Sequence, residues 1–106
     1  MSRHFFVLIN PQSGRGKSQK IGKKVSAFLK SQDIKFTVFE THNDCRGAQT
    51  VEENLTNTFT DLMIIGGDGT INEAINGLKL DLPVSFIPSG SGNDFVKNIH
   101  IGSTLE

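Results

Sequence analysis

Glycine-rich loops that directly follow apolar runs are the feature of this sequence that most restricts its fold. Apolar runs at 5–9, 62–65 and 84–87 read as short buried strands. Seven of the eleven glycines lie in the loops after them, at Gly14 and Gly16, at Gly66, Gly67 and Gly69, and at Gly90 and Gly92. A glycine loop between a strand and a helix lets a bulky anion reach main-chain N–H groups. One such loop is common, whereas three at one sheet edge indicate a phosphate-binding protein.

The segments between these runs complete an alternating pattern of strands and helices. Ile21, Val25, Phe28 and Leu29 recur at helical spacing and predict an amphipathic helix over about 18–31. A weaker helix is expected at 47–54, a third around 71–78, a strand at 34–40, and a further helical turn near Asp94. The strands are apolar on both faces, which predicts a parallel sheet. We therefore expect one α/β domain over 1–106, with three layers and helices on both faces of the sheet.

Composition and charge exclude several classes of protein. Eleven basic and eleven acidic residues balance, so nothing in the net charge favours nucleic acid. Cys45 is the single cysteine, so no disulfide framework or CxxC metal site is expected. No apolar stretch approaches the roughly 20 residues that a transmembrane helix needs. We expect a cytoplasmic protein, and a peripheral contact with a membrane stays open.

Basic residues are concentrated in the first third of the chain. No acidic residue precedes Asp33, whereas seven basic residues do: Arg3, Arg15, Lys17, Lys20, Lys23, Lys24 and Lys30. One interpretation is a solvated helix face. The other is a positive field close to a polyphosphate or to an anionic membrane surface.

The middle loop is the most informative of the three. The first loop, 10–17, lacks Walker A spacing, and no loop has the full dinucleotide-binding fingerprint. In the middle loop Asp68 lies among three glycines at the start of a helix, where it either caps that helix or supports a metal ion beside phosphates. Thr70 and Asn72 either donate hydrogen bonds to a ligand or act as caps. Glu73, one turn further on, is interpreted as a surface residue. In the third loop Asp94 is interpreted as a helix cap.

Taken together, these loops resemble the catalytic domain of diacylglycerol kinases, which sphingosine, ceramide and bacterial lipid kinases share. The strongest resemblance is Gly66-Gly67-Asp68-Gly69-Thr70 followed by Ile71-Asn72-Glu73. Three further segments are similar to the family in order and spacing: Asn10-Pro11 with Ser13-Gly14, Glu40-Thr41-His42, and Ile87-Pro88 with 90–95. The resemblance implies a fold related to the nucleotide-binding domains of NAD kinase and 6-phosphofructokinase.

The resemblance also implies a set of ligand-binding residues. It implies ATP and Mg²⁺ as cofactors, with ATP contacted by Asn10, Pro11, Gln12, Ser13, Gly14, Thr41, Gly66, Gly67, Asp68, Gly69, Thr70, Ile71, Asn72 and Ser91. Ser91 occupies a position that is more often threonine in the family, and it keeps the hydroxyl. Family kinases carry a second, mostly β domain that supplies the general base and a metal site. The resemblance therefore assigns no catalytic base or metal ligand to this chain, and gives Asp68 a supporting role.

The function implied is transfer of the γ-phosphoryl group of ATP to a lipid hydroxyl at a membrane surface. Diacylglycerol, a sphingoid base and a polyprenol-type alcohol are all compatible acceptors. One alternative is an NAD kinase-like or phosphofructokinase-like enzyme, whose loops also contain Gly-Gly-Asp-Gly. Another is a non-catalytic module that senses nucleotide. Exposed strand edges would also allow the domain to self-associate.

Overall fold

A computed structural model of the protein describes residues 3–11, 16–41 and 47–88. Its elements in chain order are β1 (His4–Ile9), α1 (Lys17–Ser31), β2 (Lys35–Glu40), α2 (Gly47–Asn54), β3 (Asp61–Gly66), α3 (Asp68–Gly77) and β4 (Val84–Pro88). The seven elements expected over these residues are all present, and α3 begins three residues earlier than its apolar spacing predicts. The helical turn expected near Asp94 lies outside the described residues.

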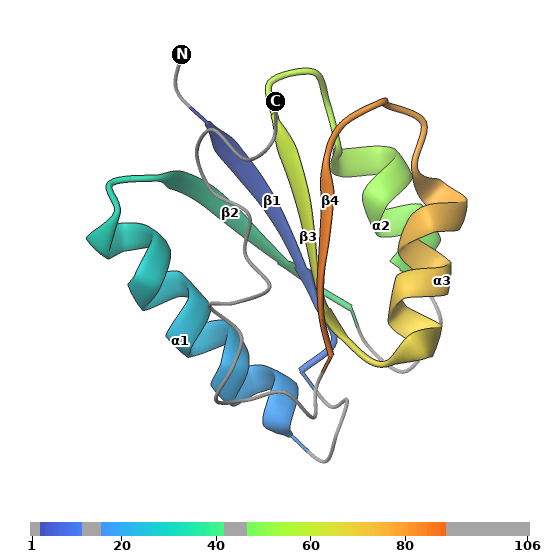
Figure 1. Ribbon diagram of the computed structural model, residues 1–106. Helices are drawn as coiled ribbons and strands as arrows, with labels where there is room; N and C mark the ends of the chain where they lie inside the picture. The colour runs from blue at the N-terminus through green and yellow to red at the C-terminus, as the bar shows by residue number, and fades with distance from the viewer. Residues whose placement is uncertain (1–2, 12–15, 42–46, 89–106) are drawn as a thin grey trace.

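The described strands form one parallel sheet in the order β2-β1-β3-β4 (Figure 1). Ile9, the last residue of β1, lies opposite Glu40 of β2 and Ile65 of β3, and Gly66 lies opposite Pro88 of β4. All four strands therefore end at the same edge of the sheet. The segments that follow them start side by side.

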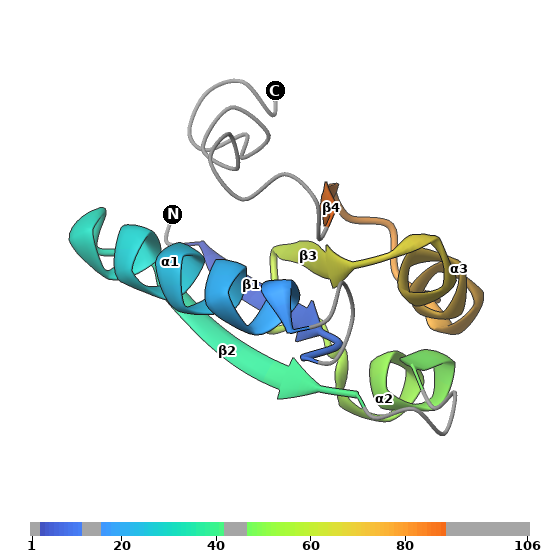
Figure 2. The ribbon, with the colours of Figure 1, turned by 90° about the horizontal axis from the view of Figure 1, so that it is seen from below.

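Helices cover both faces of the sheet, as expected. Figure 2 shows α1 on one side and α2 with α3 on the other. In β1, alternate residues serve the two layers: Phe5, Val7 and Ile9 belong to the core cluster under α1, whereas Phe6 and Leu8 belong to the cluster under α2 and α3. All five are essentially inaccessible to solvent. The predicted three-layer α/β fold is confirmed.

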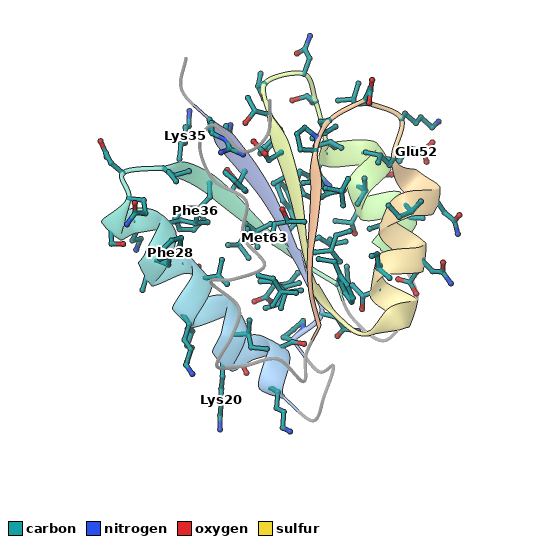
Figure 3. All side chains as sticks on the ribbon, in the orientation of Figure 1. Lys20, Phe28, Lys35, Phe36, Glu52 and Met63 are labelled. Atoms are coloured by element: carbon teal, nitrogen blue, oxygen red, sulfur yellow. The ribbon has the colours of Figure 1, made fainter. Side chains whose placement is uncertain are left out.

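β2 departs from the expectation that the strands are apolar and buried on both faces. Phe36 of β2 and Phe28 of α1 both pack against the core cluster under α1 (Figure 3). Val38, however, is 41% exposed. The reason is position: β2 is an edge strand, so its outer side meets no neighbouring strand among the described residues.

An ion pair links the residue before β1 to the first residue of β3, at the edge of the sheet where these strands begin. The Arg3 guanidinium donates to both carboxylate oxygens of Asp61, at 3.3 Å from Nε and 2.5 Å from Nη2. Asp61 is buried, and it also accepts a hydrogen bond from Thr60 Oγ1 at 2.6 Å. Because the paired charges satisfy each other, this carboxylate tolerates burial.

A glycine allows α2 and α3 to approach closely. A Cβ atom added at Gly77 would lie 2.1 Å from the main-chain oxygen of Ala48. We expect Gly77→Ala to lower the free energy of unfolding by about 1–3 kcal/mol, because the backbone must shift. Helix propensity alone would favour alanine by about 1 kcal/mol. Gly69→Ala is the matched control, since a Cβ there meets no atom within 4 Å. Urea unfolding of both variants measures the two changes in stability. Equal stabilisation of Gly77→Ala and Gly69→Ala would contradict the close contact at Gly77.

Acid is expected to destabilise the fold partly through His4. Its Nε2 lies 2.9 Å from Thr37 Oγ1, and its ring stacks on Phe59 with centroids 4.2 Å apart. Burial, followed by the nearby charge of Lys35, lowers the pKa of His4 below its ordinary value, although a backbone hydrogen bond with Thr58 opposes the shift. The unfolded chain therefore binds this proton more readily than the folded chain.

The contribution of His4 to stability is complete above the ordinary histidine pKa and is lost as pH falls through the lowered pKa. We expect the free energy of unfolding to fall between about pH 7 and about pH 5, and to fall less in His4→Phe, which keeps the ring stack. Urea unfolding at several pH values measures both slopes. Parallel curves for the two proteins would show that His4 contributes nothing to the pH dependence.

Candidate functional site

The chain segments after β1 and β2 are fixed by the ladder of the sheet. The Asn10 N–H donates to the Ile65 carbonyl at 3.1 Å, and the Thr41 N–H donates to the Ile9 carbonyl at 2.8 Å. Thr41 is buried, and Asn10 is half-buried. Thr41, Asn10 and the end of β3 therefore lie next to one another on three adjacent strands. Residues from three separate parts of the sequence were expected to converge here, and the structure brings them together.

The turn from β3 into α3 is packed tightly on its inner side. A Cβ atom at Gly66 would lie 2.6 Å from Thr70 Oγ1 and 2.9 Å from Thr70 Cβ. Thr70 itself is only 5% exposed, and its N–H donates to the Gly67 carbonyl at 3.1 Å. Gly66 is thus required by the packing of Thr70, and this packing brings the start of α3 close to the end of β3. A contact between the Thr70 hydroxyl and a ligand stays a prediction.

The same turn is open on its outer side. Gly67 is the N-cap of α3, with an extended backbone (φ −99°, ψ −171°) and no side-chain capping bond. The interpretation of Asp68 as the cap is wrong, because Asp68 is the first residue of the helix. Gly69 is exposed, and a Cβ there would meet nothing within 4 Å. The first N–H groups of a helix have no partner inside it, so this terminus offers donors and the positive end of the helix dipole.

The next residues of the motif point in different directions around α3. Ile71 packs against the core cluster under α2 and α3, whereas Asn72 is exposed. Glu73 is not the surface residue that the sequence suggested. Its Oε1 accepts a hydrogen bond from the Gly47 N–H, the first residue of α2, at 3.0 Å. The sequence carries no local sign of this contact, since the two residues are 26 positions apart.

Part of the expected site lies outside the described residues. Pro11 is half-buried just after β1. Gln12, Ser13, Gly14, Arg15, His42 and Ser91 lie outside the described residues. Among the described side chains, no three histidines, cysteines or carboxylates lie close enough together to hold a metal ion.

A pocket beside the strand ends was not anticipated. It measures about 300 Å³ and lies between α1 and the strands β1 and β2. Its residues are Val7, Ile9, Gln19, Gly22, Lys23, Ser26, Val38 and Glu40. The sequence contained one sign of close packing here: a glycine inside α1. A Cβ at Gly22 would lie 2.5 Å from Ile9 Cδ1.

Comparison with known proteins identifies the family. The model of the diacylglycerol kinase catalytic domain matches residues 4–106. The chain belongs to the diacylglycerol kinase catalytic domain family. It is 35% identical to sphingoid long chain base kinase 4 of Schizosaccharomyces pombe over 92% of its own length, and 34% identical to sphingoid long-chain bases kinase 1 of Arabidopsis thaliana over 85%.

The fold also matches this family. A crystal structure of a diacylglycerol kinase from Bacillus anthracis superposes with a TM-score of 0.61 over 91% of the chain, at 23% identity. The chain spans 23% and 13% of the two named relatives and 36% of the solved kinase. No helix in the described ranges is long and apolar enough to cross a membrane.

Proposed function

We propose that this member of the diacylglycerol kinase family binds ATP with Mg²⁺ at the carboxyl edge of its sheet, for transfer of the γ-phosphoryl group to a lipid hydroxyl. The observation that carries the proposal is the uncapped N-terminus of α3, which follows two glycines and lies beside Asn10 and Thr41. Helix N-termini of this kind bind phosphates through main-chain N–H groups and the helix dipole.

Each part of the proposed site has a chemical role. The N–H groups at Gly67, Asp68 and Gly69 donate to phosphate oxygens, and the absent Cβ atoms leave room for the anion. Asp68 supports Mg²⁺, which neutralises charge on the phosphates. Thr70, Ile71 and Asn72 belong to the proposed set on the α3 side, where Asn72 is the exposed side chain and Thr70 and Ile71 pack inward. Asn10 and Thr41 belong to the opposite side. Pro11, Gln12, Ser13, Gly14 and Ser91 complete the proposed set.

The family match favours a lipid acceptor over the acceptors of NAD kinase or phosphofructokinase. Two relatives are named as kinases of sphingoid bases, and the solved neighbour is named as a diacylglycerol kinase. What their names share is a long-chain lipid alcohol. Phosphoryl transfer mainly requires positioning and charge stabilisation. As the family resemblance implies, the general base is assigned to a second, mostly β domain.

The charge on α1 supports a peripheral contact with an anionic membrane. Lys17, Lys20, Lys23, Lys24 and Lys30 are all exposed, and α1 contains no acidic residue. Figure 3 shows Lys20 extending away from the sheet at one end of this layer and Glu52 on the opposite layer. Although the whole chain is neutral, the fold thus places a strongly basic surface on one side. Such a surface attracts anionic headgroups by about 1 kcal/mol per lysine.

Calorimetric titration with ATP tests the nucleotide site. We expect saturable binding that weakens when Mg²⁺ is removed, and a loss of at least about tenfold in affinity in Gly67→Val and in Asp68→Ala. The valine would obstruct the approach of the phosphates, and the alanine would remove the carboxylate that supports the metal. Asn76→Ala, an exposed change near the far end of α3, is the control and should bind normally. Intact binding in both loop variants would remove the α3 terminus from the site.

The acceptor class is tested in catalytically active protein that contains this chain. Radiolabelled phosphate should pass from ATP to diacylglycerol or sphingosine in mixed micelles, and not to NAD or fructose 6-phosphate. Transfer to either soluble acceptor would contradict the lipid kinase proposal. Nucleotide binding with no transfer to any acceptor would favour the sensing module instead.

Vesicle sedimentation tests the membrane contact of α1. We expect binding to vesicles containing anionic phosphatidylglycerol, and at least about tenfold weaker partitioning after Lys20, Lys23 and Lys24 are all changed to glutamine. Lys79→Gln on the opposite layer is the control. Raised salt should weaken binding of the unmodified protein, because the attraction is electrostatic. Equal binding to neutral phosphatidylcholine vesicles would contradict the role of the lysines.

A further inference from the structure

Glu73 makes a contact that the proposed chemistry does not use. Its Oε1 accepts the Gly47 N–H at 3.0 Å, and the side chain is half-buried between α3 and α2. Gly47 is the first residue of α2, so its N–H is among the groups that a helix leaves without an internal partner. The carboxylate therefore satisfies a main-chain donor and also places a negative charge at the positive end of α2.

The packing around this contact leaves little freedom. A Cβ atom at Gly47 would lie 2.5 Å from Glu73 Oε1 and 2.7 Å from Glu73 Cβ. One turn further along α3, Gly77 lies against the main chain of Ala48. The first two residues of α2 are thus held on α3 at two successive turns. Glycine at 47 and 77 is what allows this approach.

Glu73 also connects two segments that reach the candidate site. On one side, α3 begins with the open turn at Gly67 to Gly69, and Thr70 anchors that turn against Gly66. On the other side, Thr41 is held at the end of β1, and α2 is the next described element after it. The hydrogen bond from Gly47 to Glu73 therefore ties the helix that follows Thr41 to the helix that carries the open turn.

We propose that Glu73 is a positioning residue of the nucleotide site, which holds the N-terminus of α2 on α3 so that both sides of the site are preformed. This inference rests on the proposed nucleotide binding. It assigns Glu73 no contact with the ligand: the carboxylate acts through the main chain of α2. A preformed site avoids the entropic cost of ordering its parts when the ligand binds.

Three variants distinguish positioning from the other roles that a carboxylate could have here. Glu73→Ala removes the acceptor and the charge, Glu73→Gln keeps an acceptor oxygen but removes the charge, and Val51→Ala weakens the α2–α3 layer without touching the hydrogen bond. Val51 is fully buried in that layer, which makes it the matched control for lost stability.

ATP affinity is measured by calorimetry well below the unfolding temperature of each variant. We expect Glu73→Ala to lose about tenfold in affinity, Glu73→Gln to stay within about threefold of the unmodified protein, and Val51→Ala to bind normally despite its lower stability. Exchange of the Gly47 amide hydrogen, followed by NMR, should be slow in the unmodified protein, slower still with ATP bound, and fast in Glu73→Ala.

Each contrary result has a distinct meaning. Tighter ATP binding in Glu73→Ala would show that the carboxylate only repels phosphates, which overturns the proposal. Equal losses in Glu73→Ala and Val51→Ala would show a purely structural role, which also overturns it. Absence of binding in the unmodified protein would instead refute the proposed nucleotide site itself, and the positioning role with it.

Discussion

The burial of β1 on both faces and both edges is the constraint on which the rest of this domain depends. β1 pairs with β2 on one side and with β3 on the other, and its alternate residues supply the two core clusters. Because the sheet is parallel, one register places the ends of its strands at one edge. The candidate site therefore follows from the same apolar residues that form the core. Its first members, Asn10 and Thr41, are hydrogen-bonded to the ends of the neighbouring strands.

Glycine allows neighbouring groups to approach the main chain closely at several points of the fold. Gly66 makes room for Thr70, Gly47 for Glu73, and Gly77 for Ala48. Gly69 differs, because its missing side chain leaves open space on the outside of the turn. Two uses of glycine thus occur within one motif: Gly66 packs the helix against the sheet, and Gly69 leaves the helix terminus accessible. An accessible terminus on a tightly held helix is well suited to bind phosphate, since little order is lost on binding.

The basic residues of α1 and the open N-terminus of α3 are separated in the fold. Five exposed lysines lie on α1, whereas the open helix terminus lies in the other helical layer. The basic surface and the proposed phosphate site therefore lie in different layers of the fold. The pocket between α1 and β2 belongs to the basic layer, at the edge strand where Val38 is exposed.

The sequence by itself determined the order and type of the described elements and the glycine turn between β3 and α3. These features are local: a period of 3.6, a short apolar run and a glycine turn are each legible within a few residues. The strand order, the exposure of β2, and the partner of Glu73 were decided by the tertiary structure alone. They depend on contacts between residues far apart in the chain, such as the 26 positions between Gly47 and Glu73. The sequence predicts a surface position for Glu73, because no local pattern shows that a helix terminus elsewhere in the chain requires its carboxylate.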